Sequence, residues 1–76
     1  MDLGERIATW RKARGMSQGA LARAVGVTRA AVSQWEDLSE EGTAPSQANL
    51  ERVVAALNTT MAAFYGAIPK RKARAA

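Results

Sequence analysis

The 76-residue chain contains neither cysteine nor histidine. It can therefore form no disulfide, no thiolate or imidazole metal site, and no catalytic centre that depends on either side chain. Its few acidic residues are scattered over expected helix ends and one loop, so no catalytic constellation is visible. We expect a protein without metal or cofactor that is not an enzyme.

Long apolar segments are also missing. No run approaches the ~18–20 residues that a membrane span requires, and the N-terminus lacks the basic and apolar regions of a secretory signal. These absences predict no membrane association and a cytoplasmic protein. With 47% hydrophobic and 24% charged residues, the composition is that of one small globular domain.

The net charge of +4 is unevenly distributed. Residues 1–35 contain six basic and two acidic residues, whereas residues 36–66 contain one basic and five acidic residues. Residues 67–76 add four basic residues and have too few apolar groups to fold alone. We interpret this last segment as a flexible basic arm that adds salt-sensitive affinity for nucleic acid, or as a linker.

The stretch 18–36 predicts two short helices that meet at a steep angle. Apolar residues recur at helical spacing on both sides of a glycine, which ends a helix at no steric cost. Thr28 then follows as an N-cap. Seven inward or turn positions fit a DNA-binding helix-turn-helix: Leu21, Ala22, Val25, Gly26, Val27, Val32 and Trp35.

This arrangement points the polar side chains of the second helix, residues 29–37, away from the core. Arg29 can form two hydrogen bonds with guanine, and Gln34 can pair with adenine or bind a phosphate. Ser33 and Ala30 are weaker candidates for base contact, and each of these residues could instead simply face solvent. The predicted DNA-binding residues are Gln18, Arg23, Thr28, Arg29, Ala30, Ser33, Gln34 and Thr43.

The flanking candidates each have a second interpretation. Gln18 begins a helix and can bind a phosphate or cap that helix. Arg23 and Arg14 can contact phosphates or be solvated. Near Thr43, in the acidic loop 38–45, backbone N–H groups can face a phosphate.

One ion pair is predicted from position. Arg11 lies one turn from Ile7 and beside Trp10, so its stem is expected to be partly buried, and a buried guanidinium needs a carboxylate. Glu36, directly after Trp35, is the best-placed acid. The alternative is two unrelated surface charges.

The remaining elements follow from capping residues and periodicity. Helices are expected over residues 3–13, 18–25, 29–37, 47–57 and 61–65. Asp2 and Glu5 are expected to form a capping box at the first helix. Near the C-terminus, Phe64 is expected in the core. Its apolar neighbours Met61, Tyr65 and Ile68 form either a self-association patch or an intramolecular contact with the first helix.

These residues also match a family pattern. The run LGERIATWRKARGMSQGALARAVGVTRAAVSQWE, a proline-containing loop and NLERVVAALNTTMAAFYG together resemble the Cro and lambda-repressor type of helix-turn-helix, the Xre family. The resemblance covers residues 3–66. It implies an all-α, lambda-repressor-like bundle of five helices, with residues 1–66 as the DNA-binding domain. It further implies a repressor-type transcriptional regulator that binds double-stranded operator DNA as a two-fold homodimer.

The alternative function is a protein-interaction module. The apolar C-terminal segment or the basic arm could bind a partner protein, as in an antitoxin-like interaction module that regulates its own expression.

Overall fold

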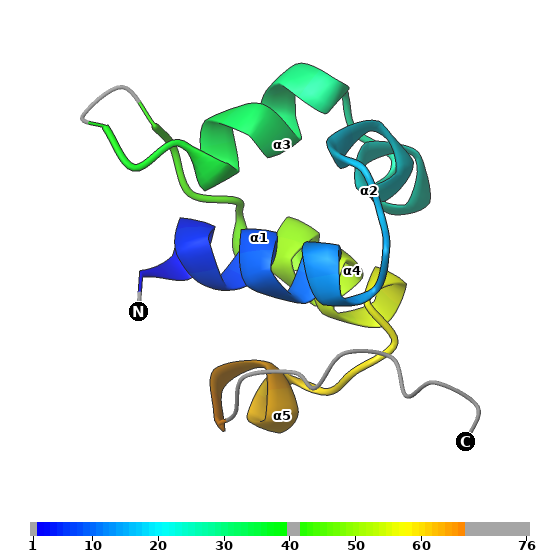
Figure 1. Cartoon of the computed structure of the whole chain (residues 1–76). Helices are drawn as coiled ribbons and strands as arrows, with labels where there is room; N and C mark the ends of the chain where they lie inside the picture. Colours follow the sequence, from blue (N-terminus) through cyan, green and yellow to red (C-terminus); the bar gives the residue numbers. More distant parts are fainter. Residues whose placement is uncertain (1, 40–41, 67–76) are drawn as a thin grey trace.

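The computed structural model describes residues 2–39 and 42–66 (Figure 1). This part of the chain is all helical and contains no strand, as predicted. Its helices are α1 (Leu3–Ala13), α2 (Gln18–Val25), α3 (Arg29–Glu36), α4 (Gln47–Ala56) and α5 (Met61–Gly66). None of the helices in the described ranges is long and apolar enough to span a membrane.

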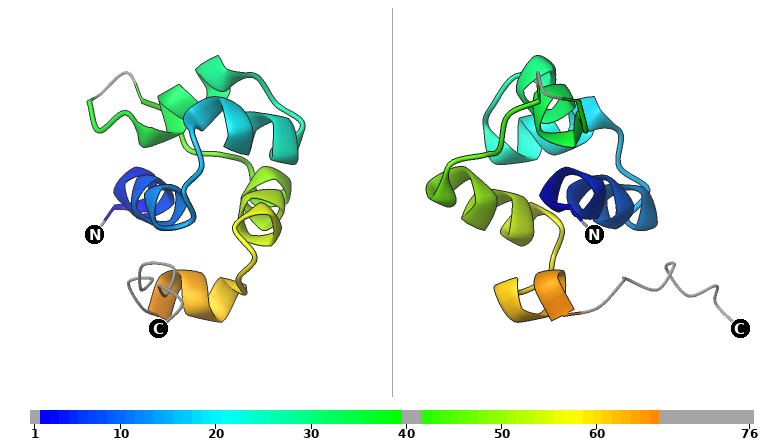
Figure 2. Two further views of the ribbon diagram at one scale, coloured as in Figure 1. Left: turned by 45° about the vertical axis from the view of Figure 1, so that its right-hand side comes forward. Right: turned by 90° about the vertical axis from the view of Figure 1, so that its left-hand side faces the viewer.

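The helices form three levels along the vertical direction of the views (Figures 1 and 2). α2 and α3 lie at one end, α1 and α4 lie in the middle, and α5 lies at the other end. α2 packs against α3 and α4, whereas α1 packs against α3 and α5. The helix-turn-helix pair and α5 therefore occupy opposite ends of the domain.

One apolar core joins these levels. Each of the five helices contributes to it, and Phe64 is the contribution of α5. The fully buried hydrophobic side chains are Ile7, Leu21, Val32, Val53, Leu57 and Phe64. The burial of apolar surface is the main force that holds such a small bundle together, and it stabilises the fold by about 25 cal/mol for each Å² removed from water.

Side-chain caps fix where four of the helices begin. The hydroxyl oxygens of Ser17, Thr28, Ser46 and Thr60 each accept a hydrogen bond from the backbone N–H three residues later. The predicted capping box at α1 is wrong, because Asp2 occupies the N-cap position without a side-chain cap hydrogen bond. Its side chain lies instead at an exposed cavity beside the start of α1.

Three helix ends differ from prediction by one residue, whereas α1 and α2 end as predicted. α3 ends at Glu36 because Asp37 is already extended, with φ −73° and ψ 118°. α4 ends at Ala56, with Leu57 as its C-cap, and α5 extends to Gly66. Asn58, beyond the end of α4, adopts the left-handed conformation, with φ 56°.

Gly4 sets the approach of α1 to α3. This residue is buried in the first turn of α1. A Cβ atom at position 4 would clash with the backbone carbonyl oxygen of Trp35. The absent side chain thus lets the start of α1 pack directly on the end of α3.

Candidate nucleic-acid interface

The turn between α2 and α3 is built by Gly26. Its φ of +87° lies in the left-handed region, where glycine carries no steric penalty. The N–H groups of Gly26 and Val27 both donate to the Ala22 carbonyl, at 2.9 and 3.0 Å. Thr28 then caps α3 by accepting from the Ala31 N–H at 3.1 Å. This short turn holds the two helices at a fixed angle.

The inner face of α3 is fully used by packing. Val32 has no exposed surface and Trp35 is 7% exposed. Both belong to the same hydrophobic core as the buried residues of α2. The outer side of α3 is left to solvent. All five predicted residues on this side are exposed: Thr28, Arg29, Ala30, Ser33 and Gln34.

Two arginines flank the start of α2. A Cβ atom at Gly19 would lie 4.0 Å from Nη1 of Arg23 and 4.0 Å from Cδ of Arg29. Both arginines are exposed. Gly19 therefore lies between the side chains of two exposed arginines, near the starts of both α2 and α3. Such a site attracts anions, because helix N-termini carry positive partial charge.

The predicted Arg11–Glu36 ion pair forms and is bidentate. Nε of Arg11 donates to Oε2 of Glu36 at 2.7 Å, and Nη2 donates to Oε1 at 2.8 Å. Nη1 of Arg11 also donates to the Met16 carbonyl at 2.9 Å. The side chains of the pair are only 10% and 8% exposed. The hydrogen bond to Glu36 raises the pKa of Arg11, an effect that burial partly opposes.

Gln18 lies at this ion pair. Its Nε2 donates to Oε1 of Glu36 at 3.1 Å, and its side chain is half-buried. The sequence predicts Gln18 at a phosphate or as a cap, and it does not indicate the Glu36 partner. The reason is that Glu36 lies 18 residues away, at the far end of α3.

The structure revises the expectation for Thr43. The backbone N–H of Thr43 donates to the Gln34 carbonyl at 3.1 Å, so this group already has a partner. The exposed Thr43 hydroxyl is the part of the residue that remains a DNA-binding candidate. Its position beside the last turn of α3 follows from the same hydrogen bond.

Several basic residues of the N-terminal half serve the fold. Nε of Arg14 donates to the Leu57 carbonyl at 2.8 Å, and its guanidinium lies over the Trp10 ring. Nη1 of Arg6 donates to the Phe64 carbonyl at 2.9 Å, which also accepts from Nε1 of Trp10 at 3.2 Å. Arg14 therefore stabilises the end of α4, which neither of its two predicted roles anticipated.

The C-terminal apolar cluster divides into two parts. Phe64 is fully buried and stacks near Trp10, with ring centroids 6.1 Å apart, and Met61 packs on the core. Tyr65 remains 49% exposed. The contact of α5 with α1 is thus intramolecular, and Ile68 lies outside the described residues.

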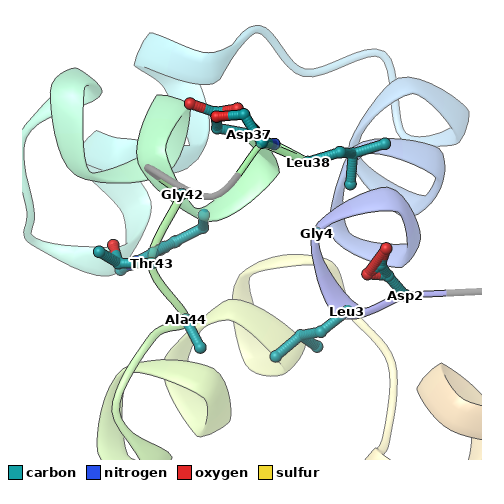
Figure 3. A pocket seen from close by; sticks show the side chains of 10 residues that line it. Asp2, Leu3, Gly4, Asp37, Leu38, Gly42, Thr43 and Ala44 are labelled. Atoms are coloured by element: carbon teal, nitrogen blue, oxygen red, sulfur yellow. Dashed lines mark hydrogen bonds between the residues drawn. The ribbon is translucent and has the colours of Figure 1, made fainter.

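A cavity of about 230 Å³ lies at the other end of α3 from Arg29 (Figure 3). It is lined by the start of α1, the end of α3 and residues 37–39 and 42–44, with Leu3, Leu38 and Ala44 among its labelled residues. Asp2 and Asp37 give it two carboxylates. It is separate from the arginines that flank Gly19.

Solved structures of high similarity are DNA-binding regulators. The P22 c2 repressor in complex with a synthetic operator is 35% identical, with a TM-score of 0.72 over 87% of this chain and 96% of that chain. SinR of Bacillus subtilis in complex with DNA is 34% identical, with a TM-score of 0.70 over 83% of this chain and 97% of that chain. A comparison with curated protein sequences finds no match.

The sequence model of the HTH_3 family, described as helix-turn-helix, matches residues 7–64. That range includes the whole α2–turn–α3 unit and the core residues that support it. The chain therefore belongs to the HTH_3 family of helix-turn-helix proteins.

Proposed function

We propose that this chain is a transcriptional repressor that reads operator DNA with α3 in the major groove. The observation that carries the proposal is the division of α3: its inner side is sealed in the core, and its outer side exposes Arg29, Ser33 and Gln34. A helix-turn-helix presents the first residues of its second helix to base edges. Arg29 is the first residue of α3 and has the charge and reach to bind guanine O6 and N7.

Two copies are proposed to bind together. The two recognition helices would then enter successive major grooves about 34 Å apart, on a roughly palindromic site. Because α5 lies opposite the helix-turn-helix (Figure 1), an association through its exposed Tyr65 leaves α3 uncovered. A protein that acts on operator DNA by binding needs no catalytic step, so we propose no enzymatic activity. It works in the compartment that holds the DNA, which we propose to be the cytoplasm.

The experiment is selection of bound sites from random duplex DNA at two salt concentrations. The proposal expects enriched half-sites with a spacing of one helical turn and affinity that falls steeply with salt. If the selection enriched no sequence, the repressor proposal would be wrong.

Arg29→Ala tests the assignment of base reading. The variant should lose preference at one position of each half-site, at about 1–3 kcal/mol for a bidentate arginine–guanine contact. Arg23→Ala is the matched control, since Arg23 is also exposed and also flanks Gly19. It should weaken all sequences alike, and an unchanged base preference in Arg29→Ala would contradict the assignment.

A protein-binding role is a second candidate. One solved structure contains SinR together with the protein SinI. It is 29% identical to this chain, and the match covers 86% of this chain and 61% of that chain. Here, the half-exposed Tyr65 on α5 is the feature that favours such a role. Co-purification from the native host tests it, because a stoichiometric partner protein would support the antitoxin-like alternative.

A further inference from the structure

Glu36 links three elements that converge behind the DNA-facing surface. Its carboxylate receives two hydrogen bonds from Arg11 of α1 and one from Gln18, the first residue of α2. Glu36 itself is the last residue of α3. One buried carboxylate therefore connects the recognition helix to the residue at the start of α2.

The geometry of the Gln18 amide follows from this contact. A glutamine amide nitrogen carries two N–H donors. The bond to Oε1 of Glu36 uses one of them, at 3.1 Å, and holds the amide plane in place. The second N–H then has a fixed direction, away from the carboxylate, and the half-buried side chain has little freedom to turn.

Charge makes this arrangement compatible with DNA. A bare carboxylate near a phosphate would repel it. Arg11 neutralises Glu36 through two short, charge-assisted hydrogen bonds, so the carboxylate acts on Gln18 as an acceptor without presenting an unpaired negative charge.

We propose that Glu36 is a positioning residue for DNA binding: it holds the Gln18 side-chain amide so that its second N–H donates to a backbone phosphate. This inference rests on the proposed function, because it needs DNA at the start of α2. It assigns the Arg11–Glu36 pair a role in affinity besides its role in the fold.

The test is a double-mutant cycle of Glu36→Met and Gln18→Met, with DNA affinity and urea unfolding measured for every variant. Glu36→Met removes the acceptor of the Gln18 amide, so it should weaken binding to specific and random duplexes alike, by about tenfold. In the Gln18→Met background, the same change should have no more effect than Asp37→Asn. Asp37→Asn is the matched control, because it removes a negative charge from the same end of α3 without touching Gln18.

The two measurements separate positioning from stability. Loss of the ion pair should lower the free energy of unfolding in both backgrounds, whereas its effect on DNA affinity should need Gln18. Equal effects of Glu36→Met on DNA affinity in both backgrounds would overturn the proposal. An increase in affinity would also overturn it, since it would mean that Glu36 competes with DNA for Gln18.

A second measurement uses the unmodified chain and so does not depend on variants that fold. Nuclear magnetic resonance follows the two Gln18 amide protons as duplex DNA is added. The proton bonded to Glu36 should keep its shift, and the other should move. If both moved to the values of a free amide, the proposal would be wrong. If no resonance of α2 or α3 responded to any duplex, the proposed function itself would fail.

Discussion

At the scale of single residues, Gly4 is the position where one methyl group has the largest predicted effect on stability. A Cβ at this site meets the Trp35 carbonyl oxygen and lies 3.3 Å from Cα of Glu36, and neither backbone can move without shifting α3. Gly4→Ala should lower the free energy of unfolding by about 1–3 kcal/mol, the usual penalty of overpacking. Urea unfolding followed by circular dichroism measures it.

Gly19→Ala is the control for this change. Gly19 is also helical, but a Cβ there would meet only atoms at 3.9–4.0 Å, an ordinary contact distance. Alanine favours helix over glycine by about 1 kcal/mol. This variant should therefore be more stable than the parent. If both variants lost stability equally, the close approach of α1 to α3 would not be the cause.

Asp37 provides a prediction about pH. The backbone N–H of Ser39 donates to Oδ1 of Asp37 at 2.8 Å, and this bond, followed by one from the Ser39 side chain, lowers the pKa of Asp37. A carboxyl group whose pKa is lower in the folded state stabilises the fold above its unfolded pKa. That stabilisation is lost as the pH falls through the folded value.

A carboxyl titration by nuclear magnetic resonance tests the cause of this shift. In Ser39→Ala the backbone N–H remains, so the pKa of Asp37 should rise from its parent value yet stay below the ordinary value of about 3.9. A complete return to that ordinary value would show that the hydroxyl, and not the backbone, is the dominant donor.

Some residues could not have been assigned from the sequence because their partners are distant backbone atoms. Arg14 reaches a carbonyl 43 residues away, and the clash at Gly4 involves a carbonyl 31 positions further along. Backbone carbonyls carry no residue-specific signal. The Arg11–Glu36 pair could be predicted from the sequence, because both partners are charged side chains that lie next to apolar residues with helical periodicity.

At the scale of elements, helix starts were more predictable than helix ends. Ser17, Thr28 and Ser46 cap their helices through a local hydrogen bond that the sequence encodes within three residues. At the end of α3, the backbone of Asp37 is extended and leads into the following loop. In that loop, the backbone N–H of Thr43 donates to the Gln34 carbonyl. Such an end is decided by a tertiary contact.

The Arg11–Glu36 pair is the polar connection between elements that should matter most. Arg11→Met leaves the Glu36 carboxylate buried at 8% exposure without its partner. Removing one member of a buried pair costs about 3–5 kcal/mol, whereas replacing both by apolar residues recovers much of that loss. Thermal unfolding should show a large drop for Arg11→Met and a smaller one for Arg11→Met/Glu36→Leu.

Lys12→Met is the matched control for that prediction. Lys12 is the next residue of α1, carries the same charge and is exposed. Its replacement should change the free energy of unfolding by no more than about 0.5 kcal/mol. A loss equal to that of Arg11→Met would assign the effect to net charge and not to the buried pair.

At the scale of the whole molecule, the proposed DNA-binding surface of α2 and α3 carries less of the positive charge of the N-terminal half than the sequence indicates. Arg6, Arg11 and Arg14 each bond a carbonyl or carboxylate within the domain. Arg23 and Arg29 are the exposed arginines beside the helix-turn-helix. The acidic residues of 36–66 then leave little net attraction for DNA in the domain itself.

The four basic residues of segment 67–76 therefore become a testable source of affinity. Their structure lies outside the described residues, but their charge equals the net charge of the chain. Replacing Lys70, Arg71, Lys72 and Arg74 by glutamine should weaken binding to all duplexes. It should also lower the slope of log affinity against log salt by about 0.9 for each phosphate that the variant no longer neutralises. Base preference should stay the same, because α3 is unchanged.

Arg52→Gln is the control for the basic segment, since Arg52 is exposed on α4, which lies in the middle level of the domain and not in the helix-turn-helix (Figure 1). It should leave the salt slope as it is in the parent. An unchanged slope after neutralisation of 67–76 would show that this segment binds no phosphate. The two arginines beside Gly19 and the Gln18 amide would then have to supply the electrostatic part of binding. In that case Arg23→Ala should lower the slope by about the amount expected for a single phosphate.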